Sequence, residues 1–187
     1  VSGLLINNDT LDLFVCHFPS RSRGTKLTEP YREKAAEIVK AASDSILSHR
    51  QRGQVIILGD LNDYPQSPSI KSVLKATALD AGGIIHPNNL YHLLADKQKE
   101  KSWVSYKYQG RWQLLDHIIV SGTLLQPTSP LHTHNDWADV CRLPFLLTTD
   151  ERHGGLQPFR TYYGMRYQGG YSDHLPVFTT FRLIYDM

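Results

Sequence analysis

The hydrophobic and polar positions of the chain form short apolar runs, interrupted by one long helical repeat. Near the start, two apolar runs flank the polar residues 7–9, and this pattern predicts a β-hairpin whose second strand ends at His17. Apolar residues then recur at helical spacing over residues 35–46, which predicts a helix with Thr28 as its N-cap. The first part of the chain is therefore expected to form a hairpin followed by a helix.

Further strands are predicted downstream. The apolar run at residues 54–59 is typical of a buried strand, and residues 113–121 predict another. A last strand is predicted at residues 174–184. Residues 123–170 are irregular and rich in Pro, Gly, Thr and aromatic residues, which indicates a functional loop or an insertion with short elements. Strands interspersed with helices favour a layered α/β fold, with a single domain over residues 1–187.

Composition and charge narrow the class of protein. With 187 residues, 41% hydrophobic and 20% charged, the chain is long enough for one globular domain with a sizeable core. Its formal net charge of +2 argues against a broad basic face for nucleic acid. No segment approaches the roughly 18 consecutive apolar residues of a membrane span. The nine histidines, by contrast, invite a search for a functional site.

Several polar residues follow directly on apolar strands. In the stretch IILGDLNDYP (residues 56–65), a buried run ends at Asp60 and Asn62, which predicts either a side-chain-stabilised turn or a metal–phosphate active site. His17 also ends a strand, where a core or edge histidine is the simpler interpretation. Asp116 lies inside an apolar strand and needs a partner there, because an unpaired buried charge is costly.

An imidazole is the natural partner for Asp116. Successive side chains of a strand point to opposite faces, so Asp116 and His117 cannot both line one site. His174 follows another acid, Asp173, in a similar setting. An Asp–His pair orients the imidazole ring and stabilises its protonated form. Hard oxygen ligands such as Asp60 and Asp173 suit Mg²⁺ or Mn²⁺ better than zinc.

Four short motifs carry a resemblance to a known family. They are HFPSR at residues 17–21, GDLND at 59–63, LDHIIVS at 115–121 and SDHLPV at 172–177. In this order the motifs resemble those of the endonuclease/exonuclease/phosphatase superfamily, and they span nearly the whole chain. The resemblance implies a four-layer α/β sandwich of the deoxyribonuclease I-like type, which cuts phosphoester bonds with a divalent metal, Mg²⁺ or Mn²⁺.

The resemblance also implies roles for individual residues. Asp60 and Asn62 would position or deprotonate the attacking water and contact phosphate. Asp173 would be a metal or water ligand, and His174 the phosphate-binding or acid–base histidine, paired with Asp116. His17 would match the histidine found near the leaving-group side.

One feature of the family has no counterpart in the sequence. An Asn and a metal-binding Glu are expected upstream of the first motif, and the early acids Asp9 and Asp12 lie in the wrong context. We therefore expect the chain to correspond to the C-terminal part of the domain, with its N-terminal part missing. Because this part is missing, we expect weakened metal binding and an exposed sheet edge. We also expect a homo-oligomer formed through the exposed apolar surface.

The long loop is the predicted place of substrate selection. Arg160 and Arg166 stand among tyrosines just before the Ser-Asp-His motif, and Arg111 precedes the strand of Asp116. Arginine can grip a phosphate and aromatic rings can stack on a base or sugar, although the aromatic residues could equally pack the loop against the core.

Three functions remain open from the sequence. The first is a nuclease or phosphodiesterase that acts on a phosphoester substrate, with nucleic acid as one candidate. The second is a phosphatase or sphingomyelinase-like hydrolase. The third is a non-catalytic fragment that keeps the fold and lacks the metal-binding Glu.

Overall fold

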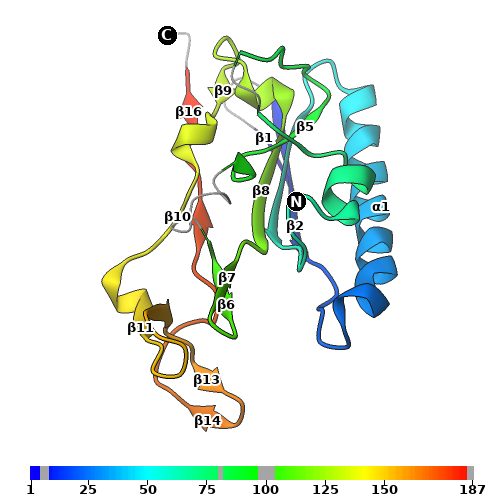
Figure 1. Ribbon diagram of the computed structural model, residues 1–187. Coiled ribbons are helices and arrows are strands. Elements are labelled where there is room, and N and C mark those ends of the chain that lie inside the picture. Colours follow the sequence, from blue (N-terminus) through cyan, green and yellow to red (C-terminus); the bar gives the residue numbers. More distant parts are fainter. Residues whose placement is uncertain (5–8, 80–81, 97–103, 185–187) are drawn as a thin grey trace.

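A six-stranded sheet forms the centre of the computed structural model, which describes residues 1–4, 9–79, 82–96 and 104–184 (Figure 1). The strand order is β1-β2-β3-β8-β5-β4. These strands are β1 (Ser2–Leu4), β2 (Thr10–His17), β3 (Gln54–Asp60), β4 (Thr77–Ala78), β5 (Leu90–His92) and β8 (Asp116–Ser121). The predicted hairpin is confirmed as the antiparallel pair β1–β2, while its turn lies outside the described residues. β2 runs parallel to β3, and β3 runs antiparallel to β8.

The long helix α1 (Thr25–His49) covers one face of this sheet (Figure 1). Its inner side packs Ala36 and Leu47 against Val55 and Ile57 of β3, which have almost no exposed surface. Burial of such side chains is the main source of stability for a surface helix.

The predicted N-cap of this helix is wrong. The helix begins at Thr25, after Gly24, so Thr28 already lies inside its first turns. The Thr28 hydroxyl donates to the Gly24 carbonyl at 2.8 Å and accepts a hydrogen bond from Arg32 at 2.6 Å. The sequence pattern missed this because the hydroxyl of Thr28 serves a tertiary contact instead of a cap.

Short two-stranded ladders cover the other face of the sheet (Figure 1). Together they form a second β layer, and an apolar core that includes Ile118, Leu124 and Val140 lies beneath it. The ladders are β6 (Tyr106–Tyr108) with β7 (Arg111–Gln113), β9 (Leu131–His132) with β16 (Arg182–Leu183), and β10 (Asp139–Val140) with β15 (Val177–Phe178). The layered α/β sandwich that the sequence predicts is confirmed.

The predicted last strand, residues 174–184, is divided in two. β15 pairs with β10, and β16 pairs with β9, so the chain changes partner between them. At the break, the Thr133 hydroxyl donates to the carbonyl of Thr180 at 2.7 Å. The partial alternation of the sequence could not reveal this change of partner.

The irregular region contains short elements, as expected, and part of it projects from the body (Figure 1). The projecting strands are β11 (Leu147–Thr149), β12 (Leu156–Pro158), β13 (Tyr162–Tyr163) and β14 (Arg166–Tyr167). Three short helical turns occupy Gly122–Leu125, Asn135–Trp137 and Pro144–Leu146. Among the described residues, no helix is both long and apolar enough to cross a membrane.

A buried ion pair ties α1 to the loop after β3. Arg32 Nε lies 2.7 Å from Asp63 Oδ2, and the two side chains are 0% and 2% exposed. The Ser69 hydroxyl donates to the same carboxylate oxygen at 2.7 Å, which fixes the helical segment η1 (Ser69–Val73). Asp63 therefore holds three elements in place, from a position next to the polar tip of β3.

We expect Asp63→Ala to lower the free energy of unfolding by about 3–5 kcal/mol, because it leaves the Arg32 charge buried without a counter-ion. Urea denaturation measures this change. The control is Asp44→Ala, which removes the acid of the exposed Lys40–Asp44 pair and should cost no more than about 1 kcal/mol. Equal losses in the two variants would contradict a structural role for the buried pair.

Candidate active site

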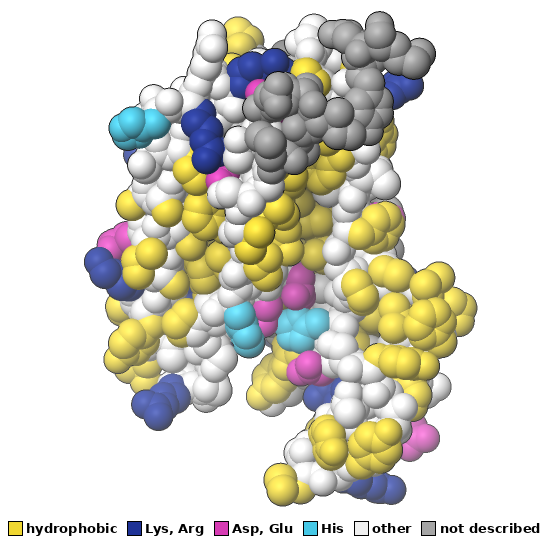
Figure 2. Space-filling view, turned by 180° about the vertical axis from the view of Figure 1, so that it is seen from behind, with side chains coloured by type: hydrophobic (Ala, Val, Ile, Leu, Met, Phe, Trp, Pro, Cys, Tyr) yellow, Lys and Arg dark blue, Asp and Glu magenta, His cyan; other side chains and the backbone are white. Residues whose placement is uncertain are grey.

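Strand register brings three polar side chains to one edge of the central sheet. His17 on β2 is the register partner of Asp60 on β3, and Asp60 is the partner of Asp116 on β8. The three strands therefore end in a row of groups that can titrate. Figure 2 shows acidic and histidine side chains gathered on one face, close to an apolar surface.

The backbone after β3 is built for this position. Gly59 has a φ of +127°, and a Cβ there would meet the Cys16 carbonyl oxygen at 2.0 Å, so only glycine allows β2 and β3 to approach this closely. Asn62 has a φ of +52°, in the left-handed region that Asn tolerates better than most residues.

Asn62 holds the carboxylate of Asp60. Its backbone N–H donates to Asp60 Oδ1 at 2.8 Å, and its Nδ2 donates to Asp60 Oδ2 at 3.1 Å and to the Phe18 carbonyl at 3.0 Å. The side-chain-stabilised turn is therefore present, and the active site stays a prediction. Asp60 stabilises a turn and at the same time faces the other titratable groups.

Asp116 and His174 form the central contact of the site. His174 Nδ1 lies 2.7 Å from Asp116 Oδ2, as expected from the burial of Asp116, and His174 Nε2 lies 4.0 Å from Asp60 Oδ2. The Ser105 hydroxyl also donates to Asp116. The ring of Tyr106 stacks on the His174 ring with centroids 4.5 Å apart. The imidazole is therefore fixed on one side by a carboxylate and on its face by an aromatic ring.

The surroundings shift two pKa values in this group. Burial lowers the pKa of His174, but the hydrogen bond to Asp116 and the charges of Asp116, Asp60 and Asp173 outweigh burial and raise the pKa above its ordinary value. Burial raises the pKa of Asp60, while its hydrogen bond from Asn62 and the nearby His174 oppose the rise. The site thus favours a protonated imidazole beside a carboxylate of increased basicity.

Three of these side chains are placed to hold a cation. One donor atom each from Asp60, Asp116 and His174 lie within 4.8 Å of one another. Two carboxylates with one imidazole fit a hard divalent cation such as Mg²⁺ or Mn²⁺, whose remaining ligands would be water and phosphate oxygens.

Other predicted residues lie at varying distances from this centre. His17 Nε2 is 3.5 Å from Asp60 Oδ2, and the His17 side chain is 75% exposed. Asp173, the metal ligand that the resemblance implies, is exposed and stands outside the three-residue group, although its charge acts on His174. Arg111 is exposed on β7.

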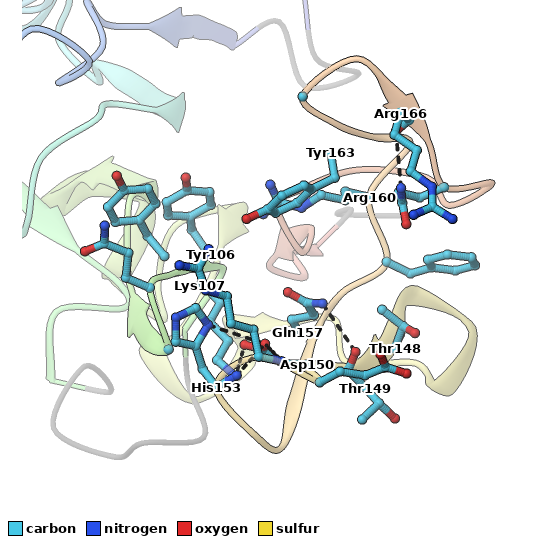
Figure 3. A pocket seen from close by; sticks show the side chains of 18 residues that line it. Tyr106, Lys107, Thr148, Thr149, Asp150, His153, Gln157, Arg160, Tyr163 and Arg166 are labelled. Atoms are coloured by element: carbon cyan, nitrogen blue, oxygen red, sulfur yellow. Dashed lines mark hydrogen bonds and ion pairs between the residues drawn. The ribbon is translucent and has the colours of Figure 1, made fainter.

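Arg160 and Arg166 line a groove beside the site, together with Tyr106 (Figure 3). Since Tyr106 also stacks on His174, the groove and the site share a wall. Ser105 and Tyr106 were not predicted as site residues. In the sequence they stand out only as part of the strand-like segment before the strand of Asp116. The pairing of β6 with β7 in the structure shows that this segment lies beside the site.

A pair of buried histidines lies behind the site. The Leu94 N–H donates to His92 Nδ1 at 3.1 Å, so in the neutral ring His92 Nε2 carries the hydrogen and donates to His117 Nδ1. His117 Nε2 then donates to the Asp63 carbonyl at 2.9 Å. This chain of bonds supports the loop of Asp60 from inside. His117 thus lies on the face opposite Asp116, as alternation along the strand predicts.

The sequence profile of the endonuclease/exonuclease/phosphatase family matches residues 1–183. No curated protein matches the chain. Among solved structures, a humanized TDP2 of D. rerio is similar with 18% identity and a TM-score of 0.50, over 94% of this chain and 57% of that one. Sphingomyelinase C from Streptomyces griseocarneus is similar with 14% identity and a TM-score of 0.51, over 97% of this chain and 55% of that one.

These similarities to solved structures support the fold. The chain spans little more than half the length of either protein.

We expect the buried His117 to make stability depend on pH. Burial lowers its pKa from 6.5 to about 4, in spite of the Asp63 carbonyl and the charges of Asp116 and Asp63. Below pH 6.5 the unfolded chain binds a proton here that the folded chain does not, so stability falls as the pH drops and levels off near pH 4. The expected loss between pH 7 and pH 5 is about 2 kcal/mol.

Urea denaturation at both pH values, in the presence of EDTA, measures this loss. His117→Gln should show a smaller loss than the wild type, while His134→Gln, whose side chain is 59% exposed, should keep the wild-type dependence. An unchanged pH dependence in His117→Gln would show that this imidazole is not neutral in the folded protein.

Proposed function

The chain belongs to the endonuclease/exonuclease/phosphatase family, and on that premise we propose that it hydrolyses phosphodiester bonds, as a nuclease or phosphodiesterase. The observation that carries the proposal is the Asp116–His174 hydrogen bond of 2.7 Å, with Asp60 4.0 Å from the other ring nitrogen. A charged imidazole between two carboxylates can bind a phosphate oxygen and donate a proton.

His174 supplies positive charge where the phosphoryl group gains negative charge. Its Nδ1 is held by Asp116, which leaves Nε2 as the atom that faces a bound phosphate. The stack of Tyr106 on the ring keeps the imidazole plane fixed. Preorganised charge of this kind lowers the barrier because no reorganisation is needed during the reaction.

Asp60 is the residue that orients and deprotonates the attacking water. Burial raises its pKa, so the carboxylate accepts a proton more readily than an exposed one does. Asn62 donates to both oxygens of this carboxylate and fixes its direction. His17, whose Nε2 lies 3.5 Å from Asp60 Oδ2, would protonate the leaving group.

The carboxylates of Asp60 and Asp116 would hold a divalent cation beside the protonated His174, which cannot itself be a ligand in that form, and Asp173 would reach the cation through water. Such a cation neutralises phosphate charge and acidifies water when bound. Arg160 and Arg166, which line the groove beside the site, are proposed to bind the substrate away from the scissile bond, and exposed Arg111 on β7 is proposed as a further contact.

We expect the chain to release p-nitrophenol from bis(p-nitrophenyl) phosphate with Mg²⁺ or Mn²⁺, and to lose this activity in EDTA. His174→Gln and Asp60→Asn should each lower kcat by about 10²–10⁴-fold, because each removes a proton-transfer or charge-stabilising group. The matched control is His134→Gln, a histidine that pairs with Asp136 outside this site.

The monoester p-nitrophenyl phosphate separates the diesterase from a phosphatase, since a phosphatase would prefer it. Hydrolysis that survives both substitutions would overturn the site assignment. A complete lack of hydrolysis with either cation would favour the non-catalytic alternative.

A further inference from the structure

The groove beside the active site has a volume of about 880 Å³. One wall is formed by β6 and the turn that follows it, and the other by the β13–β14 hairpin and the segment before it (Figure 3). Tyr106 belongs both to this groove and to the stack on His174. A substrate that reaches the catalytic histidine can therefore continue directly into the groove.

The first wall presents a series of aromatic rings. Tyr106 and Tyr108 are two residues apart on one strand, so they point to the same side, and their rings are nearly parallel at 12° with centroids 6.4 Å apart. Tyr108 is 53% exposed, and Tyr163 on the opposite wall is 58% exposed. Half-exposed aromatic rings on two walls of one groove suit a planar ring that stacks on them.

An ion pair whose two charges cancel lies at the floor of the groove. Lys107 Nζ lies 2.8 Å from Asp150 Oδ2, and the two side chains are 4% and 6% exposed. Lys107 also donates to the carbonyls of Gly154 and Leu156 at 2.8 and 3.1 Å. This pair fixes the floor and adds no net charge for a ligand.

The remaining charge of the groove is positive. Glu151 and Arg152 line it as one acid and one base, which leaves Arg160 and Arg166 in excess. Within the part of the chain that the structure describes, neither of these two arginines forms an ion pair with a carboxylate. A cationic headgroup would be repelled here, and an anion would be attracted.

Arg160 in addition has an unused hydrogen-bond donor. Its Nε is buried and makes no hydrogen bond to the described residues. Its guanidinium carbon lies 5.5 Å from the centroid of the Tyr163 ring. A buried donor without a partner is costly, and it can bond to an oxygen of a bound anion only if the side chain moves to expose it.

From these features we propose that the groove binds the nucleotide next to the scissile phosphate of a single-stranded nucleic acid. Its base stacks against Tyr108 and Tyr163, and its own phosphate lies by Arg160 and Arg166. The amide and hydroxyl groups of the lining offer hydrogen bonds to base edges; they belong to Gln109, Thr148, Thr149, Gln157 and Gln168. The proposal rests on the proposed function, because it places the substrate of that same site.

A binding experiment tests the groove without turnover. The full chain is titrated in EDTA with fluorescein-labelled pentathymidylate, and with an abasic strand of the same length that carries the same phosphates. We expect pentathymidylate to bind about 10- to 100-fold more tightly than the abasic strand, the range typical of stacking one or two bases. Tyr108→Leu should remove most of this preference, whereas Arg160→Gln and Arg166→Gln should weaken binding of both strands.

Tyr31→Leu and Arg52→Gln are the matched controls, since Tyr31 is 65% exposed on α1 and Arg52 pairs with Asp9. Both should bind like the wild type. Equal affinity for the two strands would overturn the proposal, because the groove would then read only phosphate and sugar. Absence of binding to either strand would overturn it as well.

A turnover comparison separates this proposal from the proposed function. The p-nitrophenyl ester of thymidine 5′-phosphate and methyl p-nitrophenyl phosphate share the leaving group and differ in the nucleoside. We expect a higher kcat/KM for the nucleotide ester, and a loss of this advantage in Tyr108→Leu. If neither ester is hydrolysed but pentathymidylate still binds more tightly than the abasic strand, the proposed function is wrong and the assignment of the groove is supported. If both esters are hydrolysed with equal kcat/KM, the assignment of the groove is wrong and the proposed hydrolase function is supported.

Discussion

The hydrogen bond between Asp116 and His174 joins the central sheet to the segment that leads into β15, and the site depends on this contact. Asp116 opens a strand whose later residues are almost fully buried, so its carboxylate needs a partner. His174 provides that partner from the second β layer, where an isolated bridge to Tyr106 holds its backbone. The same contact therefore links two layers of the fold and prepares an imidazole for phosphate.

Neighbouring residues of β8 show how burial decides chemical character. Asp116 and His117 point to opposite faces, and only Asp116 makes a hydrogen bond to a charged partner, whereas burial dominates at His117. His174, beside Asp116, has a raised pKa, while the buried His117 has a pKa lowered to about 4. The sheet face with Asp116 thus carries charged groups. The opposite face carries the neutral His92–His117 pair, whose hydrogen bonds end at the Asp63 carbonyl. This neutral chain and the Arg32–Asp63 pair give the tip of β3 a rigid support.

The sequence predicts the layered α/β fold and the strand of residues 54–59, because both follow from periodicity. It also predicts the Asp116–His174 contact, because an unpaired buried charge is costly. The start of α1 could not be predicted, since Thr28 is used by Arg32. The division of the last strand and the His92–His117 pair also depend on contacts between distant segments. The resemblance of motifs named the site residues, and their individual catalytic roles stay predictions. Local patterns thus identify chemistry at strand ends, while tertiary packing decides which groups meet.

The central claim is that Asp116 and His174 act as one unit in phosphodiester hydrolysis. A double-mutant cycle tests it most directly, with kcat/KM for bis(p-nitrophenyl) phosphate measured for the wild type, Asp116→Asn, His174→Gln and the double variant. The account predicts strong coupling of about 1–3 kcal/mol, so that the double variant is little worse than His174→Gln alone. If the fold-losses in kcat/KM of the two single variants multiply to give the loss of the double variant, the account is contradicted, because the two residues would then contribute independently.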